Sequence, residues 1–134
     1  MPPKHELVQA WLRKARNDLI TGERALGGQP SVRDTACFHA QQAVEKALKA
    51  LMVFREVEPP RTHHIGLLLK QCGTVDARLS AMSKDLKWLT SFAVDVHYAD
   101  VGDEPTVEQA RNALLVAQRA VEIILAGMPE EARP

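Results

Sequence analysis

Residues Cys37–Leu51, with the sequence CFHAQQAVEKALKAL, carry the clearest structural signal in this 134-residue chain. When they are placed on a helix at about 100° per residue, the apolar side chains gather on one side. Those apolar residues are Cys37, Ala40, Val44, Ala47, Leu48 and Leu51. Ala36, Ala43 and Ala50 lie beside them, and such small residues let a neighbouring helix approach closely. The stretch is therefore predicted to be a long amphipathic helix that packs tightly against another helix.

Helical periodicity extends from this stretch almost to both ends of the chain, and strand patterns are nearly absent. Glycine and proline at residues 27–30 and two prolines at residues 59–60 interrupt it. Thr106 followed by Gln109 forms a capping box that begins the last helix. The predicted helices span residues 5–26, 32–55, 63–69, 75–89 and 107–128.

Long amphipathic helices with short connections are typical of an antiparallel bundle. The fold class is predicted to be all-α: an antiparallel up-and-down four-helix bundle with one additional short helix, at residues 63–69. We expect a single domain over residues 1–134, with an ordered core from about 5 to 127. Residues 93–104 lack periodicity and are predicted to form a loop, and the charged tail at 129–134 is predicted to be frayed.

Charge and composition exclude several classes of function. The chain has 17 Lys and Arg against 17 Asp and Glu, so it lacks the basic excess of a protein that binds the DNA backbone. Cys37 and Cys72 have no CxxC spacing and are expected to be reduced packing residues. The sequence contains neither a recognisable signal peptide nor an apolar run long enough to span a bilayer. We therefore predict a cytoplasmic protein that binds neither DNA nor a membrane.

The polar side of the central helix also carries apolar residues. Phe38 lies in the middle of that side, and Met52 and Val53 lie further along it. A wholly solvated face would not usually hold these three side chains, so this face is expected to meet a partner or a ligand. The predicted homodimer face consists of Phe38, Gln41, Glu45, Met52 and Val53. The alternative is a simple scatter of exposed apolar residues.

Three stretches of the chain together resemble a known family. The run CFHAQQAVEKALKAL is similar to the signature helix of small prokaryotic HEPN domain proteins. Trp11–Leu19, with the pattern W-x3-A-x2-D-L, is similar to the opening helix of that family, and Thr62–Leu68 is similar to its THxL element. His97–Asp100 stands where the family often has an Arg-Tyr-Pro-Asp turn, but the Arg and the Pro are missing. The resemblance covers about residues 7–126.

The resemblance implies a helical bundle that dimerises and acts with a minimal nucleotidyltransferase, in a pair similar to a toxin–antitoxin module. It also implies a nucleotide-binding role, with a nucleotide or RNA as the ligand. Many HEPN ribonucleases carry an Arg-x4–6-His motif late in the domain. Here the late histidine is His97, and the positions that need an Arg hold Thr90, Ser91 and Phe92.

No catalytic residue is therefore predicted, and the favoured interpretation is a non-catalytic HEPN protein. The alternative is a metal-independent HEPN ribonuclease (toxin) with a degenerate motif. In that case an arginine from outside the motif, for instance Arg111 across a dimer, would supply the cation. Arg33 and His39 satisfy the spacing formally, but they lie on the wrong helix and are interpreted as a coincidence. Because Glu-x-x-His, the pattern of di-iron bundles, does not occur, no metal and no cofactor are predicted.

A small anionic ligand is predicted to bind where the central helix meets the short helix. Lys49 lies two turns after Gln42 on the same side, and His63 begins the short helix, whose free N–H groups favour an anion. The predicted ligand-binding residues are Gln42, Lys46, Lys49, Arg61 and His63. The alternative is that His63 only caps and packs while Lys49 pairs with Glu45 in solvent.

Overall fold

The computed structural model describes residues 3–93 and 104–134. Three long helices dominate it: α1 (Lys4–Gly27), α2 (Arg33–Phe54) and α7 (Val107–Ala126). Shorter helices are α3 (Ile65–Cys72), α4 (Ala77–Ala81), α5 (Ser83–Leu89) and the 3-10 turns η1 (Thr90–Phe92) and η2 (Glu130–Ala132). The described residues contain no strand. The predictions of an all-α class and of a helical bundle are confirmed.

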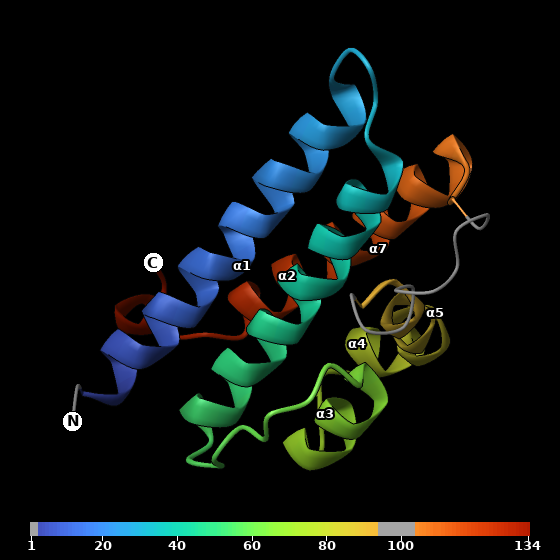
Figure 1. Ribbon diagram of the computed structural model, residues 1–134. Helices are drawn as coiled ribbons and strands as arrows, with labels where there is room; N and C mark the ends of the chain where they lie inside the picture. Colours follow the sequence, from blue (N-terminus) through green and yellow to red (C-terminus); the bar gives the residue numbers. More distant parts are fainter. Residues whose placement is uncertain (1–2, 94–103) are drawn as a thin grey trace.

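Helix α2 lies at the centre of the bundle, and the other elements pack around it. Figure 1 shows α1 running antiparallel beside it, α7 behind both, and the short helices α3 to α5 on the opposite side. Gly22 of α1 lies where the three long helices meet. A Cβ atom there would come within 2.7 Å of Leu114 Cδ2 and 3.3 Å of the Ala36 carbonyl oxygen. A glycine at this position therefore permits the close approach of α1 to both α2 and α7.

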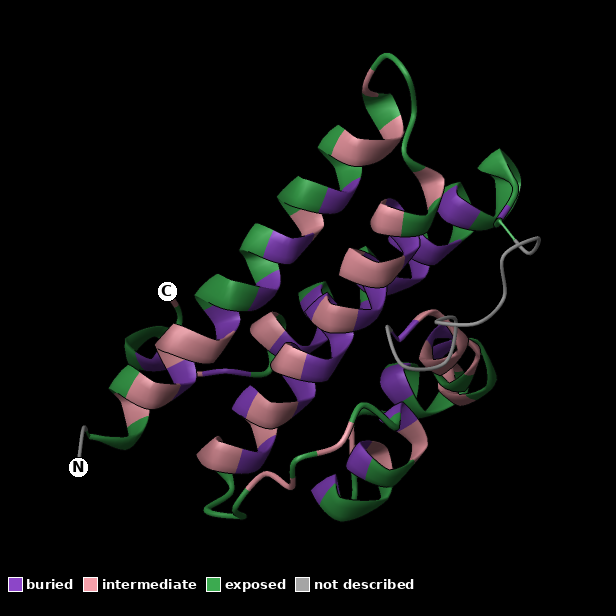
Figure 2. Cartoon of the chain, viewed as in Figure 1, coloured by how far each residue is buried: buried purple, intermediate pink, exposed green. Residues whose placement is uncertain are grey.

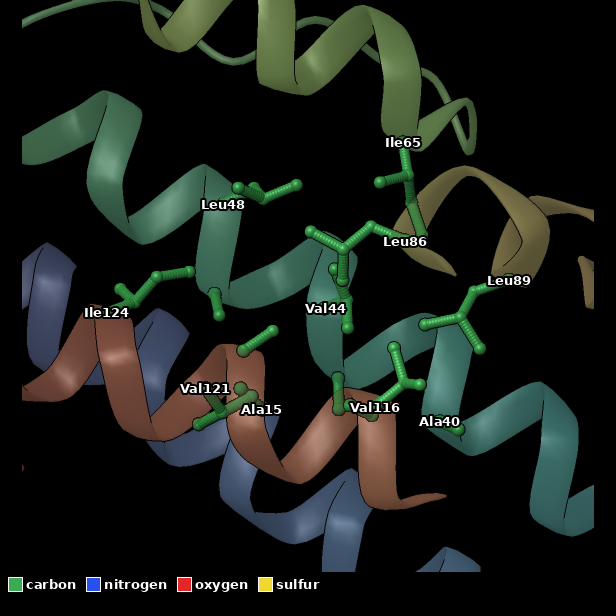
Figure 3. Packing of buried hydrophobic residues seen from close by; sticks show 14 of the residues in the cluster. Ala15, Ala40, Val44, Leu48, Ile65, Leu86, Leu89, Val116, Val121 and Ile124 are labelled. Atoms are coloured by element: carbon green, nitrogen blue, oxygen red, sulfur yellow. The ribbon is translucent and has the colours of Figure 1, made fainter. Parts of the chain in front are cut away.

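The hydrophobic core lies on the inward sides of the helices, as Figure 2 shows. In Figure 3, Val44 and Leu48 of α2 lie between side chains of the short helices and side chains of α7. Leu48, Leu86 and Leu89 are fully buried, and burying one such side chain contributes about 1.5–3 kcal/mol. Leu, Val, Ile and Ala build most of this core because aromatic residues make up only 4% of the chain.

The fourth predicted helix is divided into two short helices. Met82 has φ −91° and ψ 4°, and its N–H donates to the carbonyls of Leu79 and Ser80, so α4 ends there and α5 begins at the next residue. The short third helix begins at Ile65 rather than residue 63, because the His64 side chain caps it by accepting from the Leu67 N–H. These bends fold the chain back across α2.

The predictions at the C-terminal end have different outcomes. The capping box is confirmed, because Thr106 Oγ1 accepts from the Gln109 N–H and the Gln109 side chain accepts from the Thr106 N–H. The tail is not frayed: Ala132 is fully buried, and Gln9 of α1 donates to the carbonyls of Glu131 and Arg133. The prediction of a loop at 93–104 falls almost wholly outside the described residues. None of the helices described is long and apolar enough to cross a bilayer.

Candidate functional site

A buried carboxylate, Glu45, organises the polar side of α2. Its side chain is 5% exposed, and Oε1 accepts a hydrogen bond from Lys49 Nζ at 2.8 Å. Oε2 accepts from Gln42 Nε2 at 3.0 Å and from Gln41 Nε2 at 3.2 Å. His63 Nδ1 lies 3.0 Å from the same oxygen. Both oxygens of the carboxylate therefore interact with polar side chains of the chain itself, and most of these contacts are made by Oε2.

The charges around Glu45 decide its protonation. Burial pushes the pKa of Glu45 upward, but the hydrogen bonds and charges of Lys49 and His63 outweigh burial and hold this pKa below its ordinary value. Lys49 is 12% exposed, and its ammonium also lies 5.6 Å from the centre of the Trp11 ring. Glu45 is thus ionised at neutral pH and paired with a nearly buried cation.

Gln41 connects this cluster to the segment that precedes α3. Its Nε2 donates to the His63 carbonyl at 3.0 Å, and its Oε1 accepts from Gln42 Nε2 at 2.7 Å. Gln41 is fully buried. Because Gln41 and Glu45 bind the backbone and the ring of His63, they fix the chain between α2 and α3 onto α2. We call Gln41, Gln42, Glu45, Lys49 and His63 the Glu45 cluster.

A second buried carboxylate joins α1 to α2. Asp18 Oδ1 lies 2.7 Å from His39 Nδ1, and Asp18 Oδ2 accepts from Lys46 Nζ at 2.6 Å. The Asp18 side chain is 9% exposed, whereas those of His39 and Lys46 are 24% and 25% exposed. We call these three residues the Asp18 cluster. Each cluster contains one carboxylate, one lysine and one histidine, and each connects α2 to another segment.

The predicted ligand-binding residues are divided between the two clusters. Gln42, Lys49 and His63 do meet, but they surround Glu45 rather than an open space. Lys46 belongs to the Asp18 cluster. Arg61 is exposed and has no hydrogen bond or ion pair within residues 3–93 and 104–134. The pairing of Lys49 with Glu45 matches the simpler alternative drawn from sequence, except that the pair is buried rather than solvated.

Three of the five residues assigned to a homodimer face lie inside the chain. Gln41 and Met52 are fully buried and Glu45 is 4% exposed, whereas Phe38 and Val53 are half-buried. The premise that this side of α2 faces solvent is wrong for those three residues. The segment before α3 contacts Gln41 and Glu45 through His63.

Sequence reasoning missed the Asp18 cluster. The signal was present, since Asp18 follows Ala15 by three residues and so falls within the apolar stripe of α1. An acid in that position requires a partner on the neighbouring helix. The pattern did not reveal that the partners are His39 and Lys46.

The two cysteines, which were predicted to be packing residues, are both buried. Burial raises the pKa of the Cys37 and Cys72 thiols to about 11, so both stay protonated at neutral pH. Arg33 pairs with Glu104 at 3.1 Å, and no contact joins it to His39 in the described part of the chain. His97 lies outside the described residues. Over residues 3–93 and 104–134, no three His, Cys, Asp or Glu side chains are grouped to hold a metal ion.

Comparisons with known proteins agree with this architecture. The HEPN domain family model matches residues 8–128. Among solved structures, TT1696 from Thermus thermophilus is 28% identical, with a TM-score of 0.74 over 90% of this chain and 98% of that one. ST0689, an archaeal HEPN homologue, is 27% identical, with a TM-score of 0.69 over 87% of this chain and 93% of that one. A search of curated proteins gives no match. Because the family model spans most of the chain, this protein belongs to the HEPN domain family.

Proposed function

We propose that this chain is a non-catalytic HEPN protein that forms a homodimer and acts with a minimal nucleotidyltransferase, in a pair similar to a toxin–antitoxin module. The observation that carries the proposal is that the charged residues on the polar side of α2 already have partners within the chain. Lys46, Lys49 and Glu45 are paired inside the chain rather than presented to a substrate. Membership of the HEPN family supports the choice of partner.

The two clusters are poorly suited to catalysis. A general base and a charge-stabilising cation must both face the reacting group. In the Asp18 cluster, the ammonium of Lys46 is bonded to the same carboxylate that holds the His39 ring. In the Glu45 cluster, Lys49 and His63 are likewise bound to one carboxylate. The function that remains best supported is the presentation of a rigid helical surface to partners.

Nucleotide binding forms a finer part of the proposal. It rests on the corner between α2 and α3, where the His63 side chain is 55% exposed and Arg61 is exposed. Lys46 and Lys49 can bind a nucleotide phosphate only by giving up their bonds to the carboxylates of Asp18 and Glu45. We therefore expect weak binding, and a Lys49→Ala, His63→Ala double variant should weaken it further if the corner is used. Calorimetric titration with AMP and ATP measures both.

Co-purification tests the central part of the proposal. The untagged chain is expressed together with a tagged minimal nucleotidyltransferase. The complex is captured through the tag, and its molar mass is measured by light scattering. We expect a stoichiometric complex that contains two copies of this chain. Failure of the chain to bind the nucleotidyltransferase, when both proteins are folded, would overturn the assigned partnership.

The alternative function, a ribonuclease with a degenerate motif, has less support. In η1, Thr90 Oγ1 accepts from the Ile65 N–H and Ser91 Oγ donates to the Trp88 carbonyl. The positions at which a ribonuclease would need an arginine thus serve to join α5 and η1 to α3. Cleavage would require a cation from another part of the molecule.

A further inference from the structure

The outward side of α7 carries one exposed leucine with charged residues on both sides of it along the helix. Leu115 is 58% exposed, more than any other large apolar side chain that the structure describes. The charged residues of this outward stripe are Glu108, Arg111, Arg119 and Glu122, all of them exposed. The arginines lie four residues from Leu115 in the two directions, and the glutamates lie seven residues away. We call Leu115 and these four residues the α7 stripe.

Two of the four charges in the α7 stripe have no partner within the described residues. Arg111 makes an exposed contact with Glu108 at 3.3 Å. Neither Arg119 nor Glu122 has an ion-pair or hydrogen-bond partner in the described residues. An open hollow adjoins Leu115 and is lined on α7 by Glu108, Gln109, Arg111 and Asn112. The stripe therefore has both free charges and space beside its one apolar residue.

The positions of the charges around the helix make the stripe complementary to itself. At about 100° per residue, Arg111 and Glu122 lie about 40° and about 20° to one side of Leu115. Glu108 and Arg119 lie about 20° and about 40° to the other side. Two antiparallel copies of α7 can face each other across a two-fold axis that lies between them, level with Leu115 and perpendicular to both helices. This axis reverses the direction along the helix, but a residue on one side of the stripe stays on that side in the partner. Residues of opposite charge then meet across the axis.

The resulting pairs follow from helix geometry. The partner's Glu122 comes beside Arg111, and the partner's Arg119 comes beside Glu108. With a rise of 1.5 Å per residue, the members of each pair are about 4.5 Å apart along the helix, within reach of long side chains. The like charges at each level lie on opposite sides of the stripe. A parallel arrangement would instead bring the partner's Glu108 beside Arg111, so the two orientations differ in which glutamate each arginine meets.

We propose that the α7 stripe is the surface through which two copies of this chain dock, antiparallel, with Leu115 against the partner's Leu115. The inference rests on the homodimer of the proposed function and specifies its face. It also explains how a dimer forms although most of the predicted face on α2 is buried. Exposed ion pairs contribute little strength but fix orientation, so the dimer is expected to weaken as salt is added.

Two variants of Leu115 test the face and the symmetry. Leu115→Asp places like charges together at the axis and should raise the dissociation constant at least about tenfold in light scattering. Leu67→Asp is the matched control, because Leu67 is also exposed (39%) but lies on α3. Leu115→Cys should form an intermolecular disulfide on mild oxidation, since the two-fold brings the Cα atoms to about 4–7 Å. Leu67→Cys should not.

A charge exchange tests the predicted pairs. Arg111→Glu should weaken the dimer, and adding Glu122→Arg should restore it, because the double variant recreates the pair with reversed signs. Circular dichroism checks that each variant is folded.

The outcomes separate this inference from the proposed function. A monomeric wild type would overturn both the homodimer and the α7 stripe. A dimer that survives Leu115→Asp and gives no disulfide with Leu115→Cys would overturn the stripe alone. Loss of that dimer in Phe38→Asp would then assign the contact to α2. A dimer lost in Leu115→Asp, cross-linked in Leu115→Cys and rescued by charge exchange is the result that we expect.

Discussion

Glu45→Gln should destabilise the fold strongly, because it removes the charge that the surrounding donors on α2 and before α3 are placed to meet. The variant keeps the shape of the side chain but leaves the Lys49 ammonium without a counter-ion. Removing one partner of a buried ion pair costs about 3–5 kcal/mol. Since Lys49 is 12% exposed and can reach water, the lower end applies, and we expect a loss of about 3 kcal/mol.

The measurement is urea unfolding followed by circular dichroism, with thermal melting as a second readout. A loss of that size should lower the melting temperature by about 10 °C in a domain of 134 residues. Glu23→Gln on the exposed side of α1 is the matched control and should leave stability nearly unchanged. A Glu45→Gln loss below about 1 kcal/mol would refute the view that Glu45 anchors the segment before α3.

Three further changes test other parts of the structure. Asp18→Asn should destabilise by about 2 kcal/mol in the same unfolding assay, because the more exposed Lys46 and His39 lose the carboxylate between α1 and α2. A loss no larger than that of Glu23→Gln would contradict the Asp18 cluster. Thr106→Ala should cost about 1 kcal/mol by removing the cap of α7, whereas Thr106→Ser should retain most of it. The pKa of Glu45 is lowered by folding, so the unfolded chain binds more protons in acid and this stabilisation is lost as pH falls. The difference in stability between wild type and Glu45→Gln should therefore shrink below about pH 4; a gap that stays constant down to about pH 2 would argue against an ionised Glu45.

Local patterns were enough to predict the three long helices and the family. The alanines beside Val44 and Leu48 predicted the close packing of α2, and Thr106 with Gln109 predicted the start of α7. Both signals lie within a few residues of the structure that they specify. The similarity of Cys37–Leu51 to the HEPN signature helix carried the family assignment in the same way.

The candidate site could not be predicted to the same extent, because its contacts join distant parts of the chain. Gln41 and Glu45 have the helical positions of surface residues, and only the return of residue 63 across α2 buries them. Met52 is also fully buried, so of the three apolar residues behind the predicted dimer face only Phe38 and Val53 are partly exposed. The docking of the tail through Gln9 likewise has no local signal.

Incubation of the purified chain with single-stranded RNA in metal-free buffer tests the absence of catalysis most directly. We predict that the wild type produces no more cleavage than a His97→Ala variant purified in the same way. Both should match a blank without protein. Cleavage by the wild type that is lost in His97→Ala would contradict the account and assign this chain to the HEPN ribonucleases.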